Sequence, residues 1–209
     1  MSRDQEIKKR GSYHHGDLRA QLVEATRQLV EEKGPDHFTV SEACRVAGVS
    51  TAAPYKHFKD KEELLNAVTL EGMLRSQKMM TDELAKYPEG SLDRIVALGR
   101  VYIRFALQEP GVFRLIFGLA EDHADQTDLV AQGHQKFGIV QHEVASCLGQ
   151  SEVGPEEARR AFLLWSFVHG LSFLLIDGKV DKIGYPLDQE AILKEIAVRV
   201  MGDMPDAQG

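Results

Sequence analysis

Helical periodicity that stops and restarts at short intervals is the feature that most restricts what this chain can fold into. Residues 17–33 place apolar side chains at spacings of four, three and four, on one helical face: Leu18, Leu22, Ala25 and Leu29. Gly34 and Pro35 follow. This pair ends a helix, because Gly accepts a left-handed cap and Pro cannot continue the hydrogen bonding.

Further start signals lie along the chain. Thr39 with Glu42, and Asp60 with Glu63, have the spacing of capping boxes, and each pair predicts a helix N-terminus. Helices are predicted to begin near residues 17, 40, 50, 60, 91, 110, 129, 155 and 189. A break near Gly72 is an alternative for the long helix that starts at residue 60, and a loop is expected over 178–186. No stretch alternates apolar and polar residues as a strand would, so the prediction is an all-α fold of about nine helices.

The net charge of −7 by itself argues against a nucleic-acid partner, but the charge is unevenly distributed. Residues 1–62 carry 11 Lys and Arg against 10 Asp and Glu, whereas residues 63–209 carry 14 against 22. A near-neutral head with local basic spots can bind phosphate while the body stays acidic. Chance would produce the same asymmetry, so the charge pattern permits DNA binding without demonstrating it.

Cysteine content and hydropathy indicate the cellular compartment in which the protein is expected. The two cysteines, Cys44 and Cys147, exclude a disulfide scaffold and favour a reducing environment. The longest apolar run, 161–176, has 16 residues and contains two serines and a histidine. It is shorter than the roughly 18–20 residues of a membrane span, so a buried helix is predicted there. The first residues are polar and lack a signal segment. A cytoplasmic protein with no membrane partner is therefore expected.

Residues 39–58 carry the strongest functional signal, because they predict two short helices around a glycine turn. A helix-turn-helix needs small side chains where its helices cross, and Ala43 and Ala47 supply them. Gly48 allows the sharp turn, and Val49 anchors it. The outer face of the second helix could then enter a major groove about 12 Å wide. Two short helices with a Gly turn also occur for packing alone, and this pattern does not exclude that alternative.

The wider pattern is more specific. Tyr55-Lys-His-Phe58, followed by Lys61-Glu-Glu-Leu-Leu65, closely resembles the DNA-binding domain of the tetracycline-repressor (TetR) family. The resemblance covers residues 14–70 in detail and is looser downstream, where it rests on helix count and length.

A second resemblance lies near the C-terminus. The segment Trp165-Ser-Phe-Val-His169-Gly170 is similar to the signature of a subgroup of this family that is named for its Trp-His-Gly residues. The opening Tyr13-His-His-Gly-Asp-Leu18 also fits that subgroup.

The family resemblance implies three parts. Residues 1–15 would be a flexible basic N-terminal arm, which would reach phosphate or a minor groove unless it is only a solubilising tail. Residues 16–76 would be the DNA-binding domain, with its helix-turn-helix motif at 40–59. Residues 77–209 would form the ligand-binding and dimerisation domain.

Carried over by position, the recognition helix would span Ser50 to Phe58, with Tyr55, His57 and Lys61 as anchors to the DNA backbone. Phe58 would pack inside the domain. The residues assigned to DNA binding are Thr39, Ser50, Thr51, Ala52, Pro54, Tyr55, Lys56, His57 and Lys61.

Pro54 departs from the family pattern, in which many relatives carry Leu or another side chain. As the fifth position of a helix capped by Ser50, it loses the first intrahelical hydrogen bond. We therefore expect the recognition helix to begin late or irregularly, which leaves open which of Thr51, Ala52 and Ala53 face the bases. With two alanines in that set, direct readout would be sparse and DNA shape would carry much of the specificity.

Members of the resembled family pair through their last two helices, here roughly Pro155 to Asp177 and Gln189 to Met201. The first of these is apolar nearly all round, so it needs partners on more than one side. A second subunit meets that need, since a two-fold operator requires a two-fold protein. Burial within a monomer is the alternative.

The resemblance also implies a small-molecule effector in the body. The candidate cavity residues are Tyr102, Phe105, Phe113, Phe117, Phe137, Trp165, His169 and Phe173. Aromatic stripes of this kind more often form ordinary core, and His169, which shares a helix face with Trp165, is more often a core or interface histidine. A cavity of this composition suits a largely apolar effector, and no cofactor is implied.

Enzymatic function is the first alternative to a DNA-binding regulator. Histidines and aspartates within 122–142 suggest a metal site, but His134 and His142 lie about 12 Å apart along one helix, too far to share an ion. His142-Glu143 begins a zincin-like motif that fails because residue 146 is Ser. No metal and no enzymatic activity are therefore expected. A helical adaptor that does not bind DNA is the second rival, and the set Tyr55, His57 and Lys61 argues against it.

The sequence is therefore interpreted as a dimeric, ligand-responsive transcriptional regulator that binds a palindromic operator, in its simplest form as a repressor. Effector binding would favour a dimer whose recognition helices no longer match successive major grooves, about 34–36 Å apart. The long helix from Asp60 would act as the lever. Activation, or a ligand that promotes DNA binding, is also compatible with the sequence.

Overall fold

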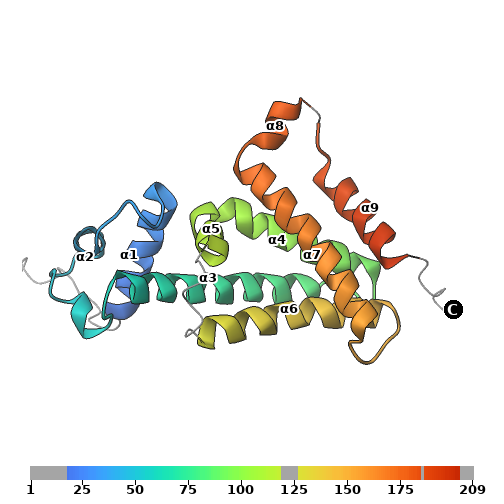
Figure 1. The fold of residues 1–209 in the computed structure, drawn as a ribbon, viewed down its shortest axis with the longest axis horizontal. Helices are drawn as coiled ribbons and strands as arrows, with labels where there is room; N and C mark the ends of the chain where they lie inside the picture. Colours follow the sequence, from blue (N-terminus) through green and yellow to red (C-terminus); the bar gives the residue numbers. More distant parts are fainter. Residues whose placement is uncertain (1–17, 119–126, 185, 203–209) are drawn as a thin grey trace, which may run out of the picture.

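The computed structural model describes residues 18–118, 127–184 and 186–202, and within these ranges all regular structure is helical (Figure 1). The α-helices are α1 (Leu18–Lys33), α2 (Val40–Ala47), α3 (Lys61–Leu84), α4 (Leu92–Gln108), α5 (Pro110–Gly118), α6 (Thr127–Cys147), α7 (Pro155–Ile176), α8 (Lys179–Ile183) and α9 (Gln189–Met201). A short 3-10 helix, η1 (Pro54–Lys56), lies between α2 and α3. The predicted all-α fold is confirmed. The predicted basic arm, residues 1–15, lies outside the described ranges.

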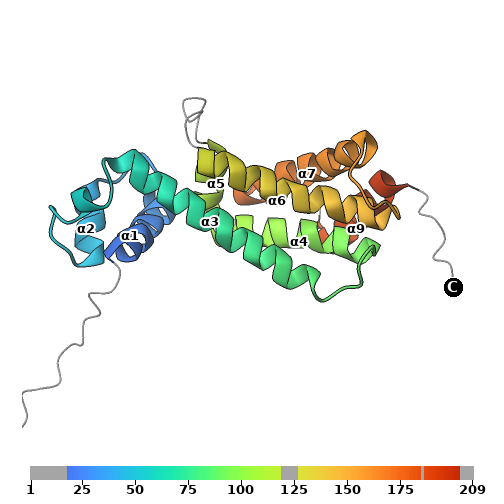
Figure 2. The ribbon, with the colours of Figure 1, turned by 90° about the horizontal axis from the view of Figure 1, so that it is seen from below.

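A small head and a larger body lie at opposite ends of the long helix α3 (Figures 1 and 2). The head contains α1, α2 and η1. The body contains α4 to α9, with α3 continuing into it to pack against α4 and α6. One helix therefore belongs to both parts, and it crosses the predicted domain boundary at residues 76 and 77 without interruption.

The start of α2 shows how local sequence forms the head. The Thr39 hydroxyl accepts a hydrogen bond from the Glu42 N–H at 3.2 Å, and the Glu42 carboxylate accepts one from the Thr39 N–H at 3.0 Å. The predicted capping box is confirmed. Gly48 ends α2 with φ of 69°, a left-handed conformation that glycine adopts at little cost.

Helix α3 is continuous through Gly72, so the alternative of a break there is wrong. The reason for glycine at this position is contact with another helix. A Cβ at Gly72 would lie 2.5 Å from the Cγ1 of Val112 on α5, far inside van der Waals contact. The small residue lets α5 pack directly on α3.

The core forms two clusters of buried apolar side chains. One belongs to the body and joins α3, α4, α6, α7 and α9. The other fills the head, and it also includes Phe105 and Ala106 of α4 and Val112, Phe113 and Leu115 of α5. The core of the head is thus continuous with side chains of the body.

The connection between α7 and α9 differs from the prediction. A loop was expected over 178–186, but the chain forms the short helix α8 between Gly178 and Gly184, both with positive φ. Helix α7 is long and apolar enough, by length and composition, to cross a membrane. It packs against α4, α6 and α9 in this fold, and a helix that is apolar on several faces is also what a core position requires.

Candidate nucleic-acid interface and ligand cavity

The predicted recognition helix over 50–58 is not an α-helix. A turn with a hydrogen bond from the Ala53 N–H to the Ser50 carbonyl (3.0 Å) leads into η1. The His57 and Phe58 N–H groups then both donate to the Pro54 carbonyl at 2.8 Å. Because Pro54 has no N–H, it cannot donate a helical hydrogen bond to Ser50, and the late, irregular start expected from Pro54 is observed.

Most of the predicted DNA contacts lie on the outer surface of this region. The exposed members of the set are Thr39, Ser50, Thr51, Ala52, Tyr55, Lys56 and His57. The Tyr55 side chain, 68% exposed, is the most accessible large apolar group of the head. Pro54 is fully buried, so its assignment as a DNA contact is wrong. Its ring instead lies in the interior of the head.

Lys61 is held by the protein itself. Its ammonium donates to the Phe38 carbonyl oxygen at 2.9 Å and lies 4.2 Å from the centroid of the Phe38 ring. This contact joins the start of α3 to the loop before α2. A role at phosphate stays a prediction, and the structure gives Lys61 a second role within the head. Phe58 is buried, as expected for a packing residue.

The body contains a cavity of about 520 Å³ among α3, α4, α5, α6, α7 and α9. Its size is that of a small-molecule site, and its wall is largely apolar. Four of the predicted residues line it: Tyr102, Phe117, Phe137 and Trp165.

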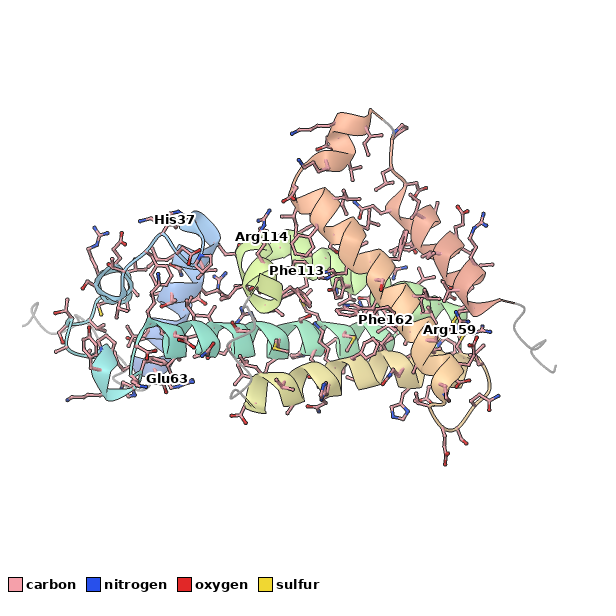
Figure 3. All side chains as sticks on the ribbon, viewed as in Figure 1. His37, Glu63, Phe113, Arg114, Arg159 and Phe162 are labelled. Carbon is pink, nitrogen blue, oxygen red and sulfur yellow. The ribbon has the colours of Figure 1, made fainter. Side chains whose placement is uncertain are left out.

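The other four predicted cavity residues do not line it. Phe105 and Phe113 are fully buried in the core cluster of the head, and Phe173 packs against that same cluster. The Phe113 ring meets the rings of Tyr102 and Phe173 at centroid distances of 5.5 and 5.4 Å, in the interior beside α5 (Figure 3). These rings fill space between helices, so assigning them to a cavity was wrong.

His169 does not line the cavity, but its side chain contacts Tyr102, which does. The Trp165 indole N–H donates to the Tyr102 hydroxyl oxygen at 3.2 Å, and that hydroxyl lies 2.9 Å from Nδ1 of His169. Tyr102 can donate to Nδ1 when the imidazole is neutral and Nδ1 carries no proton. Burial lowers the pKa of His169, which favours the same state. His169 is a positioning residue for Tyr102 and not part of the cavity wall.

Lys136 on α6 lines the cavity, and sequence reasoning missed it. Its ammonium donates to the Ser76 hydroxyl at 2.6 Å. Burial lowers its pKa from 10.5 to about 8. One signal was available: Lys136 lies four and eight residues before Val140 and Val144, so a cation occupies the apolar face of its helix.

The described residues hold no group of three His, Cys, Asp or Glu side chains that could bind a metal ion. Asp122, His123 and Asp125, which the sequence raised as candidates, lie outside the described ranges.

Head and body meet where α5 begins. The Glu31 carboxylate of α1 accepts hydrogen bonds from the Gly111 and Val112 N–H groups, both at 2.8 Å. These are free donors of a helix N-terminus, where a negative charge is also favoured. A Cβ at Gly111 would lie 2.6 Å from the Val30 carbonyl oxygen, so glycine is required for this approach. The far end of α5 reaches the cavity through Ile116 and Phe117.

Removing the Glu31 carboxylate is expected to weaken the whole protein. Glu31→Ala loses two charge-assisted hydrogen bonds and leaves two N–H groups poorly paired, so the free energy of unfolding should fall by about 2 kcal/mol. Urea unfolding followed by circular dichroism measures it. Glu32→Ala, at the exposed neighbouring position, is the control and should change stability by less than about 0.5 kcal/mol. An equal effect of the two substitutions would contradict the role given to Glu31.

Comparison with known proteins agrees with this architecture. The family model described as "Bacterial regulatory proteins, tetR family" matches residues 22–68, which include α2, η1 and the start of α3. The family model described as "Tetracyclin repressor-like, C-terminal domain" matches residues 95–200, about half of the chain. Together they cover most of the head and of the body.

Individual relatives match in the same way. The HTH-type transcriptional regulator BetI of Escherichia coli is 33% identical over 76 residues, covering 36% of this chain and 39% of the relative. The nucleoid occlusion factor SlmA of Vibrio campbellii is 28% identical over 107 residues, covering 49% and 52%. The chain thus spans about two fifths to half of the length of these curated relatives.

Similarity of the fold extends further. The solved structure of a protein of unknown function from Rhodococcus sp. RHA1 has a TM-score of 0.76 at 28% sequence identity, and the alignment covers 91% of this chain and 96% of that one. Family models match both head and body, and solved structures share the whole fold. The chain therefore belongs to the TetR family of DNA-binding transcriptional regulators.

Proposed function

We propose that this protein is a ligand-responsive repressor. Two copies bind a near-palindromic operator through their heads, and a small, largely apolar effector in the body cavity releases them. The observation that carries this proposal is the contact between the two parts: α5 lines the cavity at one end and is capped by Glu31 of the head at the other. A DNA-binding regulator acts where the chromosome lies, so we place it in the cytoplasm.

A homodimer is supported by the outer face of α7. Phe162, Leu163 and Leu174 are 54%, 42% and 45% exposed, and helical spacing places them on one face with Gly170. A Cβ at Gly170 would meet nothing within 4 Å in this chain, so its own fold does not require glycine there. A close-packed second copy would explain both the exposed apolar groups and the small residue. Figure 3 shows Phe162 on α7.

Transmission from cavity to head would run through α5. A ligand that pushes on Ile116 and Phe117 would shift α5, because both side chains belong to this short helix. Its N-terminus is tied to Glu31, and its side chains Val112 and Phe113 belong to the core of the head. A shift of α5 would therefore change the angle of the head on α3, and with it the separation of the two heads in a dimer.

The DNA contacts can be tested on the exposed loop. Tyr55→Phe combined with Lys56→Ala removes one hydroxyl and one ammonium per head and leaves buried Pro54 in place. Operator affinity should fall at least tenfold, and the slope of log K against log salt should fall by about 2, one for each lysine of the dimer. Fluorescence anisotropy over a salt series, with operator and random DNA, measures both.

The matched control is Lys78→Ala, which removes an exposed lysine of α3 that forms an ion pair with Asp82 one turn away. It should leave the salt slope unchanged. If the loop variant binds the operator with the affinity and salt slope of the parent protein, the assignment of this loop to DNA is wrong.

A further inference from the structure

The cavity wall offers a ligand few polar groups. The Thr69 hydroxyl is used within α3, where it donates to the Leu65 carbonyl at 3.0 Å. The Tyr102 hydroxyl is used twice, as acceptor from Trp165 and in a hydrogen bond with Nδ1 of His169. Burial also raises the pKa of Tyr102, so this group stays neutral. An apolar body would therefore contact most of the wall without displacing hydrogen bonds.

Lys136 and the exposed His134 are the remaining polar side chains of the wall, and Lys136 is the one that carries an ammonium. Its ammonium has three donors, and within the described part of the chain one acceptor, the Ser76 hydroxyl, is seen for them. The rings of Tyr102 and Phe105 lie 5.8 and 5.7 Å from Nζ, so two aromatic side chains flank the group. No described Asp or Glu forms an ion pair with it.

An ammonium in such a place is unusual. Buried charges in proteins are normally paired, because a lone charge away from water costs several kcal/mol. Aromatic faces attract a cation only modestly, and one hydroxyl does not neutralise it. Burial lowers the pKa of Lys136 to about 8, so the group still carries its charge near neutral pH. A positive group on a largely apolar wall thus has no anionic partner among the residues that the structure describes.

We propose that Lys136 binds the carboxylate of an effector whose remaining part is apolar and fills the cavity. The carboxylate would accept the two free ammonium donors, and the apolar part would lie against Phe117, Phe137 and Trp165. This inference rests on the proposed function, because it takes the cavity to be the effector site. It specifies the chemical class of the effector: a monocarboxylic acid with an aliphatic or aromatic body.

Trp165 provides the readout, because it is the single tryptophan of the chain and lines the cavity. Its fluorescence is followed during titration of the full-length protein with matched pairs: decanoate against decan-1-ol, and 1-naphthoate against 1-naphthalenemethanol. Decyltrimethylammonium is the cationic probe. We expect at least one carboxylate to bind ten or more times more tightly than its alcohol, and the cation to bind most weakly.

The variant Lys136→Met keeps the length of the side chain and removes its charge. It should lose the preference for carboxylate over alcohol while still binding the alcohol, which shows that the cavity is intact. Lys78→Met, at an exposed position of α3, should bind every probe as the parent protein does. Equal affinity for acid and alcohol in the parent protein, or unchanged carboxylate affinity in Lys136→Met, would overturn the proposal, as would the absence of binding by either acid.

Proton uptake gives a second readout that a merely structural lysine would not produce. A bound carboxylate should raise the pKa of Lys136, so the parent protein should take up a fraction of a proton per ligand at pH 8.5. Calorimetry in two buffers of different ionisation enthalpy measures this uptake. Lys136→Met should show none, although Tyr102 and His134, the other titratable groups of the wall, are still present.

The two proposals fail in different ways. If a carboxylate binds through Lys136 but leaves operator affinity unchanged, the inference about Lys136 stands and the release mechanism fails. If only a neutral or cationic molecule binds and releases the operator, the release mechanism stands and the inference fails.

Discussion

Replacing both Phe162 and Leu174 with glutamate is expected to separate the proposed homodimer into monomers. The two positions lie on the exposed apolar face of α7 and are 54% and 45% exposed in the single chain. In a dimer through α7 and α9, four carboxylates would enter the apolar centre of one interface. Each would lose its hydration without gaining a partner, at a cost of several kcal/mol. The dimer dissociation constant should therefore rise by more than a thousandfold.

The consequence for DNA should be equally large. A monomer contacts one half-site, so it loses the advantage of a second head held at the correct spacing. Operator affinity should fall at least a hundredfold, while the helical content stays that of the parent protein. Analytical ultracentrifugation and fluorescence anisotropy measure the two effects. Leu107→Glu, at an exposed apolar position of α4, is the control and should remain dimeric. A double variant that still sediments as a dimer would place the interface elsewhere.

Lys136→Met is expected to stabilise the protein. Burial lowers the pKa of Lys136 from 10.5 to about 8, and each unit corresponds to about 1.4 kcal/mol. The charged lysine thus costs the fold roughly 3 kcal/mol at pH 7. Loss of the hydrogen bond to Ser76 offsets about 1 kcal/mol of this. The variant should therefore unfold with a free energy about 2 kcal/mol higher than that of the parent protein.

The pH dependence of this difference has a definite sign. The pKa of the lysine is lower in the folded state, so between about pH 8 and 10.5 the unfolded chain binds more protons than the folded one. The penalty is complete below pH 8 and is relieved as the pH rises through that window. The advantage of Lys136→Met should therefore shrink to near zero at pH 10.

Urea unfolding of both proteins at pH 7 and pH 10 tests this prediction, because the other titrating groups are common to the two and cancel. Lys78→Met, which removes an exposed charge, should differ from the parent protein by less than about 0.5 kcal/mol at both pH values. A Lys136→Met protein less stable than its parent at pH 7 would show that the ammonium is better compensated than its described surroundings suggest.

Several features of the head could be predicted from neighbouring residues alone. The capping box at Thr39, the left-handed Gly48 and the irregular start caused by Pro54 each depend on atoms within four residues. The residues next to each of these features are therefore sufficient to predict it. The all-α fold and membership of the TetR family follow from such signals repeated along the chain.

The cavity could not be predicted in this way. Phe113 and Phe117 are one turn apart on the same helix, yet one is fully buried in the core and the other lines the cavity. Which ring meets empty space depends on how far α4, α6 and α7 stand from α5, and no local pattern encodes those distances. The same reason explains why Pro54 was placed at DNA: its burial depends on the elements packed against it.

The sequence by itself determined where helices start and stop, which segment resembles a DNA-binding motif and which family the chain joins. Only the tertiary structure decided that Lys61 is held by Phe38, that Glu31 caps α5 and that Lys136 faces the cavity. The physical reason is the separation along the chain between the groups that interact. Capping and turns are set by backbone groups a few residues away, whereas the burial of a charge is set by helices that lie distant in the chain and adjacent in space.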